Sequence, residues 1–384
     1  MFNSNNISIQ LQNYHISTAM DKVASHNETI AIHPLAMNDK SINRASLFSS
    51  TNTIKKEEEL TVSARSLMHH DLNPEFNKKY ILGQELGTGG YGFVVSAYER
   101  ETGIERAVKF IIRHKVPSSA WVNDPQEDGL VPMEIYCLKH IQHTNIIHYL
   151  DSYKDDVYFY LVMEIHGTQW TTSTPQLLTH DSQTDEDEDE DEIETPTTTL
   201  HRPFVRRTSY DLFECIERHK KFNETLAKHI FKQVVECVAY LDAIGICHRD
   251  IKDENIVIDN EYKVKLIDFG SAVILPRSKR SQNRKVFTKF YGTISFASPE
   301  ILMSKPYYAE PAEIWSLGVL LFTLLFGEVP FSDSKSACKG RILFPDIAVS
   351  QKARHLISSL LIKNPAQRPD IHEVLSHPWL VTLD

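Results

Sequence analysis

Two polar segments in the second half of the chain carry side chains that could act on a phosphate group. In His248–Asn255, Asp250 could accept a proton from a hydroxyl group, and Lys252 adds a nearby positive charge. Asp268 follows Asn255 by thirteen residues and opens an Asp-Phe-Gly sequence. Amide and carboxylate oxygens suit magnesium, so Asn255 and Asp268 are candidate ligands for that ion. Each segment alone could be an ordinary polar loop, but together they predict phosphoryl transfer.

A glycine-rich segment supplies groups that could bind the phosphates themselves. Gly87, Gly89 and Gly92 lie between two predicted strands, where glycines let backbone N–H groups approach an anion without obstruction by a Cβ atom. A simple glycine hairpin would look the same, and so would the glycine turn of a dinucleotide-binding fold. The second alternative requires a helix after the glycines, whereas a strand is predicted here.

A lysine and a glutamate are candidates for an ion pair behind the phosphates. Lys109 ends the apolar sequence Ala-Val-Lys, seventeen residues after Gly92, where it could reach the α- and β-phosphates of a nucleotide. Glu134 stands near the start of the next predicted helix and is its expected partner. A lone strand lysine more often points to solvent, and a lone glutamate more often lies on the surface. The order of the motifs favours the functional interpretation.

A second ion pair is predicted downstream of these motifs. Gly292–Glu300 occupies the place of a peptide-docking loop, and Arg368 lies in Asn364–Pro369, where it could pair with Glu300 while both are buried. Breaking such a pair would cost about 3–5 kcal/mol, because one buried charge would be left without its partner.

The elements that must position these residues begin with a β-rich part. Alternating apolar residues between turn signals predict five strands, Ile81–Gly87, Phe93–Glu99, Arg106–Ile112, Ile146–Tyr153 and Val157–Ile165. One helix, Met133–Ile141, is predicted among them, with Pro132 opening its first turn.

Helical periodicity dominates from Asp211 onward. The predicted helices are Leu212–His219, Leu226–Ile244, Ile314–Phe326, Ala353–Leu361 and Ile371–Leu375. A strand pair, Ile256–Ile258 and Val264–Ile267, interrupts them. A β-rich lobe followed by a helical lobe is an α+β arrangement, and we expect the motifs above to meet in a cleft between the lobes.

Composition sets the domain boundaries. Residues 1–78 are rich in Asn, Ser, Thr and His and are predicted to be a disordered tail, with a short helix around Lys55–Leu60. The N-terminal lobe and hinge are placed at 79–167, and the C-terminal lobe at 210–384. Between them, 168–209 is an acidic low-complexity insertion that cannot bury a core.

The net charge of −10 comes from one tract rather than from the whole chain. Ten of the 51 acidic residues lie in Asp181–Glu194, and the remaining 41 balance the 41 basic residues. Nothing in this balance suggests affinity for nucleic acid. The five widely spaced cysteines include no CxxC pair, which favours reduced thiols in the cytoplasm or nucleus over a disulfide framework or a zinc site.

No segment predicts membrane insertion or export. The longest apolar run, near Ile314–Phe326, is too short for a membrane span, contains Gly318, and is predicted to be a buried core helix. The N-terminus lacks a basic-then-apolar signal, and its first basic residue is Lys22. We therefore expect no membrane partner, and a monomer is the simplest expectation.

From Tyr80 to about Val381 the chain resembles the protein kinase superfamily, because all the motifs above occur in that family's order. Lys252 in the catalytic loop and Thr293 after Gly292 are similar to the Ser/Thr branch. The resemblance implies a bilobal kinase fold that transfers the γ-phosphoryl group of Mg-ATP to Ser or Thr hydroxyl groups of proteins. ATP and Mg²⁺ are then the expected cofactors.

The same resemblance implies a role for each matching residue. Met163 would be the gatekeeper, with the Glu164 carbonyl and the His166 amide binding adenine from the hinge. Further nucleotide contacts are implied for Leu86, Gly87, Gly89, Gly92, Val94, Ala107, Lys109 and Asp211. The implied catalytic set is Asp250, Lys252, Lys109, Glu134, Asn255 and Asp268, with the last two as metal ligands.

A closer resemblance is to the catalytic domain of PAS-domain-regulated kinases. It is carried by Lys115–Pro125, Leu161–Gly167, Asp211–Phe213, Ile230–Val234, His248–Asn255 and Ile267–Ala272. Members of that family serve nutrient and energy signalling, and such a role is implied by analogy. Three features depart from the pattern: the 78 N-terminal residues leave no room for a PAS domain, the acidic insertion is additional, and Glu313 replaces the aspartate that usually braces the catalytic loop.

Substrate preference and regulation follow as hypotheses. Asp211 and Glu254 match positions that bind upstream arginines in basophilic kinases, although both could be solvated carboxylates. We expect Arg or Lys three residues before the acceptor Ser or Thr. Arg206–Ser209 is a candidate autophosphorylation sequence. A phosphate on Thr288 could pair with Arg249 and order the activation segment Ser271–Tyr291, which could also be a mobile loop. Its basic residues are Arg277, Lys279, Arg280, Arg284, Lys285 and Lys289.

Two other functions are compatible with such a fold. A pseudokinase scaffold would bind partners without turnover, but such proteins normally lose one of four residues that are all present here, Lys109, Asp250, Asn255 and Asp268. A small-molecule kinase would share the fold, and the docking segment Ser298–Glu300 together with Arg368 argues against it.

Overall fold

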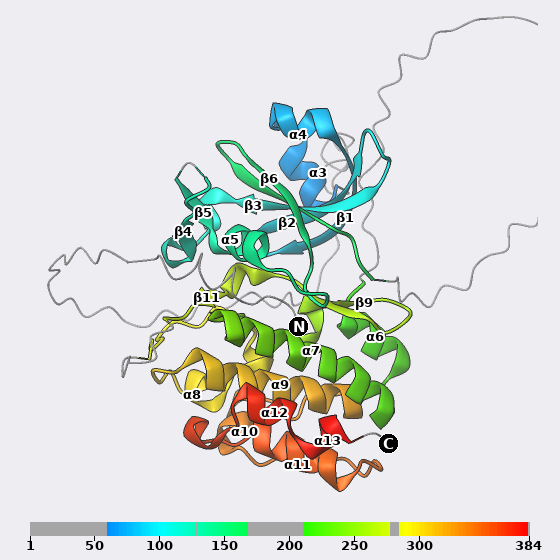
Figure 1. Cartoon of the computed structure of the whole chain (residues 1–384), viewed down its shortest axis with the longest axis vertical. Coiled ribbons are helices and arrows are strands. Elements are labelled where there is room, and N and C mark those ends of the chain that lie inside the picture. Colours follow the sequence, from blue (N-terminus) through cyan, green and yellow to red (C-terminus); the bar gives the residue numbers. More distant parts are fainter. Residues whose placement is uncertain (1–59, 128, 168–209, 277–283, 383–384) are drawn as a thin grey trace, which may run out of the picture. The chain divides into compact units, whose positions relative to one another are not determined.

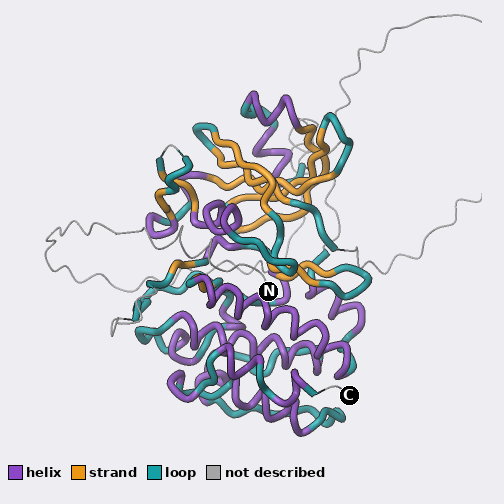
Figure 2. Tube along the Cα trace, viewed as in Figure 1, coloured by secondary structure: helices purple, strands orange, loops and turns teal. Residues whose placement is uncertain are grey.

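Most strands lie in one lobe and most helices in the other. The computed structural model describes residues 60–127, 129–167, 210–276 and 284–382, which all belong to one compact unit. Figure 1 shows the sheet of the N-terminal lobe on one side and the helices of the C-terminal lobe on the other, and Figure 2 shows the same division by secondary structure. The bilobal α+β fold predicted from the sequence is confirmed.

The N-terminal lobe is built on an antiparallel sheet with the strand order β1-β2-β3-β7-β6. Its strands are β1 Tyr80–Gly89, β2 Gly92–Glu99, β3 Glu105–Ile112, β6 Tyr149–Lys154 and β7 Tyr158–Met163. The register places Lys109 on β3 opposite Val94 on β2 and opposite Leu161 on β7. All five predicted strands are confirmed, although β6 begins at Tyr149 rather than at Ile146.

Helix α5, Met133–His140, carries Glu134 in its first turn. Pro132 is the N-cap of this helix rather than its first helical residue. A hairpin that the sequence pattern did not predict precedes the helix, with strands β4 Trp121–Asn123 and β5 Leu130–Pro132. Asp124, between these strands, is fully buried and lies 3.3 Å from the Lys139 ammonium. The hairpin therefore holds the last turn of α5.

Two short helices precede the sheet, α3 Val62–Leu67 and α4 Pro74–Lys79. Phe76 on α4 is fully buried and stacks on Tyr80, with ring centroids 5.2 Å apart. The prediction of a disordered tail to residue 78 is wrong from residue 60 onward, because this stretch buries apolar side chains against the sheet. Residues 1–59, which include most of the predicted helix around Lys55–Leu60, lie outside the described residues.

The C-terminal lobe contains α6 Leu212–His219, α7 Glu224–Ile244, α8 Pro299–Leu302, α9 Ala309–Phe326, α10 Ser334–Lys339, α11 Gln351–Leu360, α12 Ile371–Leu375 and α13 Pro378–Val381. Its short strands are β8 Ile246–Cys247 paired with β11 Val273–Ile274, and β9 Ile256–Ile258 paired with β10 Val264–Leu266. The five predicted helices and the predicted strand pair are confirmed. Helices α8, α10 and α13, of four to six residues, were not among the predicted helices.

Helix α9 forms the core of the C-terminal lobe. Its length and composition would allow it to cross a membrane, with a mean hydropathy of 1.4, but 83% of it is buried inside the fold. Gly318 permits close packing, because a Cβ atom there would lie 2.8 Å from the Leu361 side chain. The prediction of a buried core helix is confirmed, but the prediction that the run is too short for a membrane span is wrong, because the helix begins at Ala309.

All five cysteines are free thiols, as predicted, and four of them are buried. The acidic insertion 168–209, with its candidate autophosphorylation sequence, lies outside the described residues. Residues 277–283, which hold half of the basic residues of the predicted activation segment, also lie outside them.

Candidate active site

Three charged side chains from different elements meet at the junction of the two lobes. The Lys109 ammonium, on β3, lies 2.7 Å from the Glu134 carboxylate on α5 and 2.9 Å from the Asp268 carboxylate after β10. Lys109 and Glu134 are buried. Burial disfavours the charged form of Lys109, but the carboxylates of Asp268 and Glu134 outweigh it and raise the pKa of Lys109 above its ordinary value. The lysine therefore stays charged, as a phosphate-binding cation must.

The backbone at Asp268 is turned so that its carboxylate faces Lys109. Its φ of 62° lies in the left-handed region, which is uncommon for a non-glycine residue. Burial opposes the charged form, but Lys109 and a hydrogen bond from the Gly270 N–H lower the pKa of Asp268 to about 2. Phe269 is fully buried against the ring of His248, so the next residue anchors the segment in the core.

Asp250 is held from two sides by hydrogen bonds. The Asn255 amide donates to its Oδ2 at 2.9 Å, and the Thr293 N–H donates to its Oδ1 at 2.9 Å. Asn255 also donates to the carbonyl oxygen of Asp250 at 2.8 Å. Because both neighbours are donors, they fix the orientation of the carboxylate. A proton-accepting base requires such positioning.

Lys252 lies beside this carboxylate. Its ammonium forms an ion pair with Glu254. Burial disfavours the charge, whereas Glu254 and Asp250 outweigh it and raise the pKa of Lys252. The structure thus places a charged lysine next to the predicted base, where the sequence motif put it.

Glu313 on α9 braces the catalytic loop. Its Oε2 accepts hydrogen bonds from the Arg249 N–H at 2.6 Å and from the Cys247 thiol at 3.0 Å. Burial raises the pKa of Glu313, although the nearby His248 and these two donors oppose the shift. Arg249 has a φ of 66°, so the loop adopts a conformation that needs support. The glutamate makes the contact expected of the usual aspartate, and the thiol of Cys247 is a partner that the sequence did not reveal.

Replacing Glu313 by alanine should lower kcat by about ten- to a hundredfold with little change in the KM for ATP. The Arg249 N–H would lose its buried acceptor, and the loop could no longer hold Asp250 in position. Steady-state kinetics with a peptide substrate measure the effect. Glu313→Gln keeps an acceptor oxygen and should lose less activity. A folded Glu313→Ala protein with wild-type kcat would show that the brace is not needed.

The glycine-rich turn between β1 and β2 leaves open space where phosphates are expected. A Cβ atom built on Gly87 or Gly89 would meet no other atom within 4 Å. Gly92 differs, because a Cβ atom there would lie 1.8 Å from the Phe110 carbonyl oxygen. Two of the three predicted phosphate-binding glycines therefore border free space, which fits a nucleotide. The third is required by close packing against β3.

The predicted apolar contacts for a nucleotide base lie on adjacent strands. Val94 pairs with Gly87 across β1 and β2, and Ala107 on β3 pairs with Met163 at the end of β7. Leu86 and Val94 are half-buried, while Ala107 and Met163 are buried. This placement connects the glycine-rich turn with the hinge, as a base-binding surface would.

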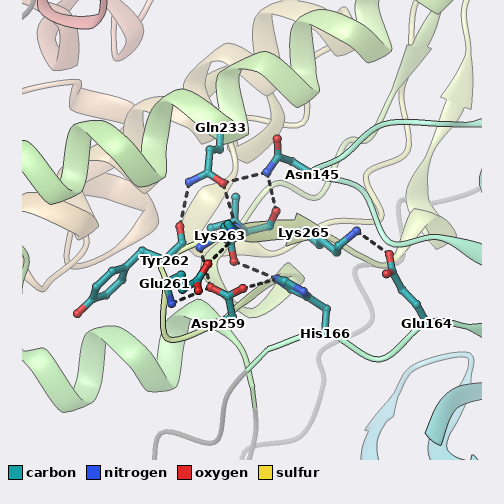
Figure 3. Close-up of polar contacts among 10 residues, drawn as sticks. Asn145, Glu164, His166, Gln233, Asp259, Glu261, Tyr262, Lys263 and Lys265 are labelled. Carbon is teal, nitrogen blue, oxygen red and sulfur yellow. Dashed lines mark hydrogen bonds and ion pairs between the residues drawn. The ribbon is translucent and has the colours of Figure 1, made fainter. Parts of the chain in front are cut away.

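Side chains of the hinge are engaged with the β9–β10 hairpin (Figure 3). Glu164 forms an ion pair with Lys265 at 2.7 Å, and the His166 ring lies 3.0 Å from the Lys263 carbonyl oxygen. Because these side chains contact the hairpin, the predicted contacts with adenine are left to the backbone carbonyl of Glu164 and the backbone amide of His166.

The loop after α5 is fixed to the C-terminal lobe by an amide network (Figure 3). The Asn145 side chain donates to the Val264 carbonyl and to the Gln233 side chain, both at 2.9 Å. Gln233 in turn donates to the Tyr262 carbonyl at 2.9 Å. The loop that follows the helix of Glu134 is thereby joined to the hairpin that leads to Asp268.

The candidate metal ligands fit a hard cation. The Ile267 N–H donates to the Asn255 carbonyl at 2.9 Å, which brings Asn255 next to the segment of Asp268. Across the described parts of the chain, no group of three or more His, Cys, Asp or Glu residues forms a metal site. A magnesium ion would therefore take its remaining ligands from nucleotide phosphates and water, which is its usual coordination in such sites.

Three carboxylates gather beside the catalytic loop. Asp211 caps α6 by accepting from the Glu214 N–H at 2.9 Å, and its backbone forms a β-bridge with Val257. Asp253 is buried, and burial together with the charges of Glu254 and Asp211 raises the pKa of Asp253 to about 6. These carboxylates make the place attractive to a cation, although Glu254 is already paired with Lys252. Asp253 was not among the predicted residues.

Arg249 stacks on aromatic residues of the activation segment. Its guanidinium lies 4.9 Å from the ring centroid of Phe287 and 5.6 Å from that of Tyr291. Phe287 forms a β-bridge with Tyr307, and Thr288 beside it is exposed. The hypothesis that phosphate on Thr288 pairs with Arg249 stays a prediction.

The predicted ion pair between Glu300 and Arg368 is confirmed. Two guanidinium nitrogens each lie 2.7 Å from a carboxylate oxygen, and both residues are buried. Arg368 also donates to the carbonyl oxygens of Pro311, Ile362 and Lys363. The docking segment is thereby fixed to the loop before α12.

Comparison with known proteins agrees with this geometry. The sequence profile described as "Protein kinase domain" matches residues 80–189 and 193–380. The chain is similar to the PAS domain-containing serine/threonine-protein kinase of Mus musculus, with 38% identity over 306 residues that cover 80% of this chain and 19% of that protein. The predicted resemblance to the catalytic domain of that family is thus confirmed.

Two further relatives bear on the extent of the similarity. Serine/threonine-protein kinase PSK1 of Saccharomyces cerevisiae is 32% identical over 302 residues, which cover 78% of this chain and 19% of that protein. Serine/threonine-protein kinase pim-2 of Danio rerio is 32% identical over 315 residues, which cover 80% of this chain and 86% of that protein. The chain spans about a fifth of the length of the mouse and yeast relatives and most of the fish one.

Proposed function

The chain belongs to the protein kinase family, and on that premise we propose that it is an active serine/threonine kinase that phosphorylates proteins. One observation carries the proposal. Lys109 lies within ion-pair distance of both Glu134 and Asp268, next to the hydrogen-bonded pair of Asp250 and Asn255. Phosphoryl transfer needs this combination of positioning and charge neutralisation.

Each residue of the site has its own role in the proposed phosphoryl transfer. Mg-ATP supplies the phosphoryl group together with the metal charge that neutralises it. Lys109, kept charged by two carboxylates, binds phosphate oxygens, and the backbone at Gly87 and Gly89 approaches them from the other side. Asp250 orients the substrate hydroxyl group and accepts its proton, while Lys252 adds positive charge nearby.

A radiolabelled-ATP assay on a degenerate peptide array tests the activity. With Mg²⁺ present, the wild-type protein should label Ser and Thr peptides, and Asp268→Asn should not. A wild-type protein that binds Mg-ATP without labelling any peptide would favour the alternative, a pseudokinase-type scaffold. Labelling by Asp268→Asn at the wild-type rate would overturn the assignment of the site.

We also propose that the substrates carry Arg or Lys, and less often His, three residues before the acceptor Ser or Thr. The support is the group of carboxylates formed by Asp211, Asp253 and Glu254 beside the catalytic loop. A cationic side chain bound there would relieve their mutual repulsion, which a neutral or acidic side chain could not do.

Removing charge from this group should weaken the binding of basic peptides. Asp211→Asn and Glu254→Gln together should raise the KM for a peptide with Arg at that position about three- to tenfold. Asparagine still caps a helix, so α6 should be preserved. A peptide with Gln in place of Arg is the control, and its KM should not respond. A peptide profile that favours acidic or proline-directed sites would defeat this preference.

A role in nutrient and energy signalling is proposed by analogy. Its support is the similarity to the mouse PAS domain-containing kinase, which is analogy rather than geometry. Comparing the phosphorylated proteins of cells with and without this kinase, before and after a change of carbon source, tests the idea. The absence of any change among proteins of carbohydrate metabolism would count against it.

We further propose a monomer in the cytoplasm or nucleus, without nucleic-acid or membrane partners. The free thiols of all five cysteines support a reducing compartment. Light scattering of the purified protein tests the monomer, and fluorescence microscopy of the tagged protein tests the location. A stable dimer or an extracellular location would contradict the respective part.

A further inference from the structure

The helices α3 and α4 are integral to the N-terminal lobe although they precede the kinase domain. The family profile begins at residue 80, so residues 60–79 lie outside it. Even so, Leu67, Leu72 and Phe76 of this segment pack into the aromatic core of the sheet. We call residues 60–79 the N-terminal brace.

One end of the N-terminal brace is anchored at the turn between β6 and β7. The His70 ring lies 2.8 Å from the Asp155 carboxylate, and the Asn73 N–H donates to the Tyr160 hydroxyl at 3.2 Å. The Asn73 side chain donates to the Lys154 carbonyl at 2.9 Å. This end is therefore tied to the turn between β6 and β7.

The other end contacts β1 through a buried carboxylate. The Ser63 N–H, in the first turn of α3, donates to Oε2 of Glu85 at 2.8 Å. Ser63 is 0% exposed and Glu85 is 4% exposed. The Thr61 side chain caps the same turn by accepting from the Ala64 N–H. A carboxylate removed from water requires such a donor, so the contact fixes both partners.

Glu85 lies where β1 departs from regular pairing. The register between β1 and β2 shifts on both sides of it, between Leu82 and Glu85 and again between Glu85 and Gly87. Irregularities of this kind re-aim side chains and are often found next to functional sites. Glu85 is two residues before Gly87, and Leu86 between them is a predicted contact of the nucleotide base. A movement of the backbone at Glu85 would therefore also shift Leu86 and Gly87 in the phosphate-binding turn.

From these contacts we propose that the N-terminal brace positions the glycine-rich turn through the Ser63–Glu85 hydrogen bond, and so sets the affinity for the nucleotide. The inference rests on the proposed function, because it assigns the turn to Mg-ATP. Glu85 is a positioning residue: it acts through the backbone at Leu86 and Gly87 and does not touch the phosphates itself.

A pair of variants of equal length tests the hydrogen bond in the full chain. Glu85→Gln keeps an acceptor oxygen, whereas Glu85→Met has the same shape and offers no such oxygen. Glu85→Met should raise the KM for ATP about three- to tenfold while kcat stays within about twofold, and Glu85→Gln should restore most of the affinity. Equal KM values for ATP in both variants and the wild type would overturn the proposal.

Two further variants separate positioning from general stability. Thr61→Ala loosens the first turn of α3 without altering Glu85, and it should raise the KM for ATP in the same direction. If Glu85→Met does not fold, the KM for ATP of Thr61→Ala tests the positioning role instead. Asn73→Ala removes the side-chain cap of α4, and it should lower the melting temperature without changing the KM for ATP. An unchanged KM in Thr61→Ala, or an equal rise in Asn73→Ala, would contradict the role of the contact.

Measuring the binding of Mg-ADP directly distinguishes a failure of the proposed kinase activity from a failure of the positioning role. If the wild-type protein binds Mg-ADP but transfers no phosphate, the proposed activity fails, and the Kd values of the same variants still test the positioning. If the wild-type protein is active and all variants bind the nucleotide equally, only the positioning role fails.

Discussion

Asp250→Asn should lower kcat for peptide phosphorylation by about 10²–10⁴-fold, the usual contribution of a positioned general base. The variant removes the group that accepts the hydroxyl proton and keeps its size. The affinity for Mg-ADP should change little, because the ion pairs of Lys109 with Glu134 and Asp268 do not involve Asp250. Single-turnover and steady-state kinetics, together with nucleotide binding, measure the two effects separately.

The hydrogen bonds around Asp250 explain why asparagine is not a silent replacement. Both carboxylate oxygens accept, one from the Thr293 N–H and the other from the Asn255 amide. An asparagine has only one acceptor oxygen, so its NH₂ group would face a donor on one side. A modest loss of stability should therefore accompany the large loss of kcat.

The matched control for this variant is Asp370→Asn. Asp370 caps α12 by accepting from the His372 and Glu373 N–H groups, both at 2.9 Å, so it too is a carboxylate that receives two donors. Its replacement should leave kcat unchanged, because asparagine also serves as a helix cap. If Asp250→Asn retained kcat within a few-fold of the wild type, Asp250 would not be the base.

The sequence predicted those parts of the site whose residues lie close together in the chain or belong to ordered motifs. Asp250 and Asn255 are five residues apart and share one loop, so their types and spacing already imply their contact. Lys109, Glu134 and Asp268 lie far apart in the chain, and their meeting was predicted from the order of the motifs. Residues joined only by packing gave no such signal. The pairing of Cys247 with Glu313 depends on how α9 crosses beneath the loop.

The N-terminal brace was missed for a different reason. Its composition, rich in polar residues, outweighed two local signals for a helix. Asn73 followed by Pro74 is a typical helix start, because asparagine caps and proline fits the first turn, and the structure shows both roles. Phe76 then supplied an apolar side chain for the core. The contact of Ser63 with Glu85 joins a helix end to an irregular strand, and no periodicity reports it.

The hairpin before α5 was missed because its strands are short and carry residues that are uncommon in strands. Trp121–Asn123 and Leu130–Pro132 have three residues each and end in Asn and Pro, unlike the wholly apolar strand Ile256–Ile258 that was predicted. Asp124 looks like a surface residue in the sequence, yet it is fully buried beside Lys139. Burial of a charge is a property of the assembled lobe rather than of its local sequence.

Arg368→Met should lower the free energy of unfolding by about 3–5 kcal/mol. Methionine keeps most of the side-chain length but leaves the buried Glu300 carboxylate without its bidentate partner. The carbonyl oxygens of Pro311, Ile362 and Lys363 would lose a donor as well. Urea denaturation followed by fluorescence measures the loss, and an unchanged m-value would show that the two-state comparison is valid.

An exposed ion pair supplies the control. Lys78 and Glu75 lie 2.6 Å apart, but about 70% of each side chain is exposed. Glu75→Gln should leave the free energy of unfolding nearly unchanged, since exposed pairs contribute little. A similar cost for Glu75→Gln and Arg368→Met would mean that burial of the pair does not determine its importance.

The double variant Arg368→Met with Glu300→Leu separates the two physical causes. If the main cost is the unpaired buried carboxylate, removing that carboxylate should recover part of the stability lost in Arg368→Met alone. If the main cost is the lost attraction and the lost carbonyl donors, the double variant should be no more stable than the single one. We expect recovery, because both partners are buried and a leucine in place of Glu300 leaves no charge to desolvate. Such recovery would assign the pair to holding the docking segment in one position rather than to strengthening the fold as a whole.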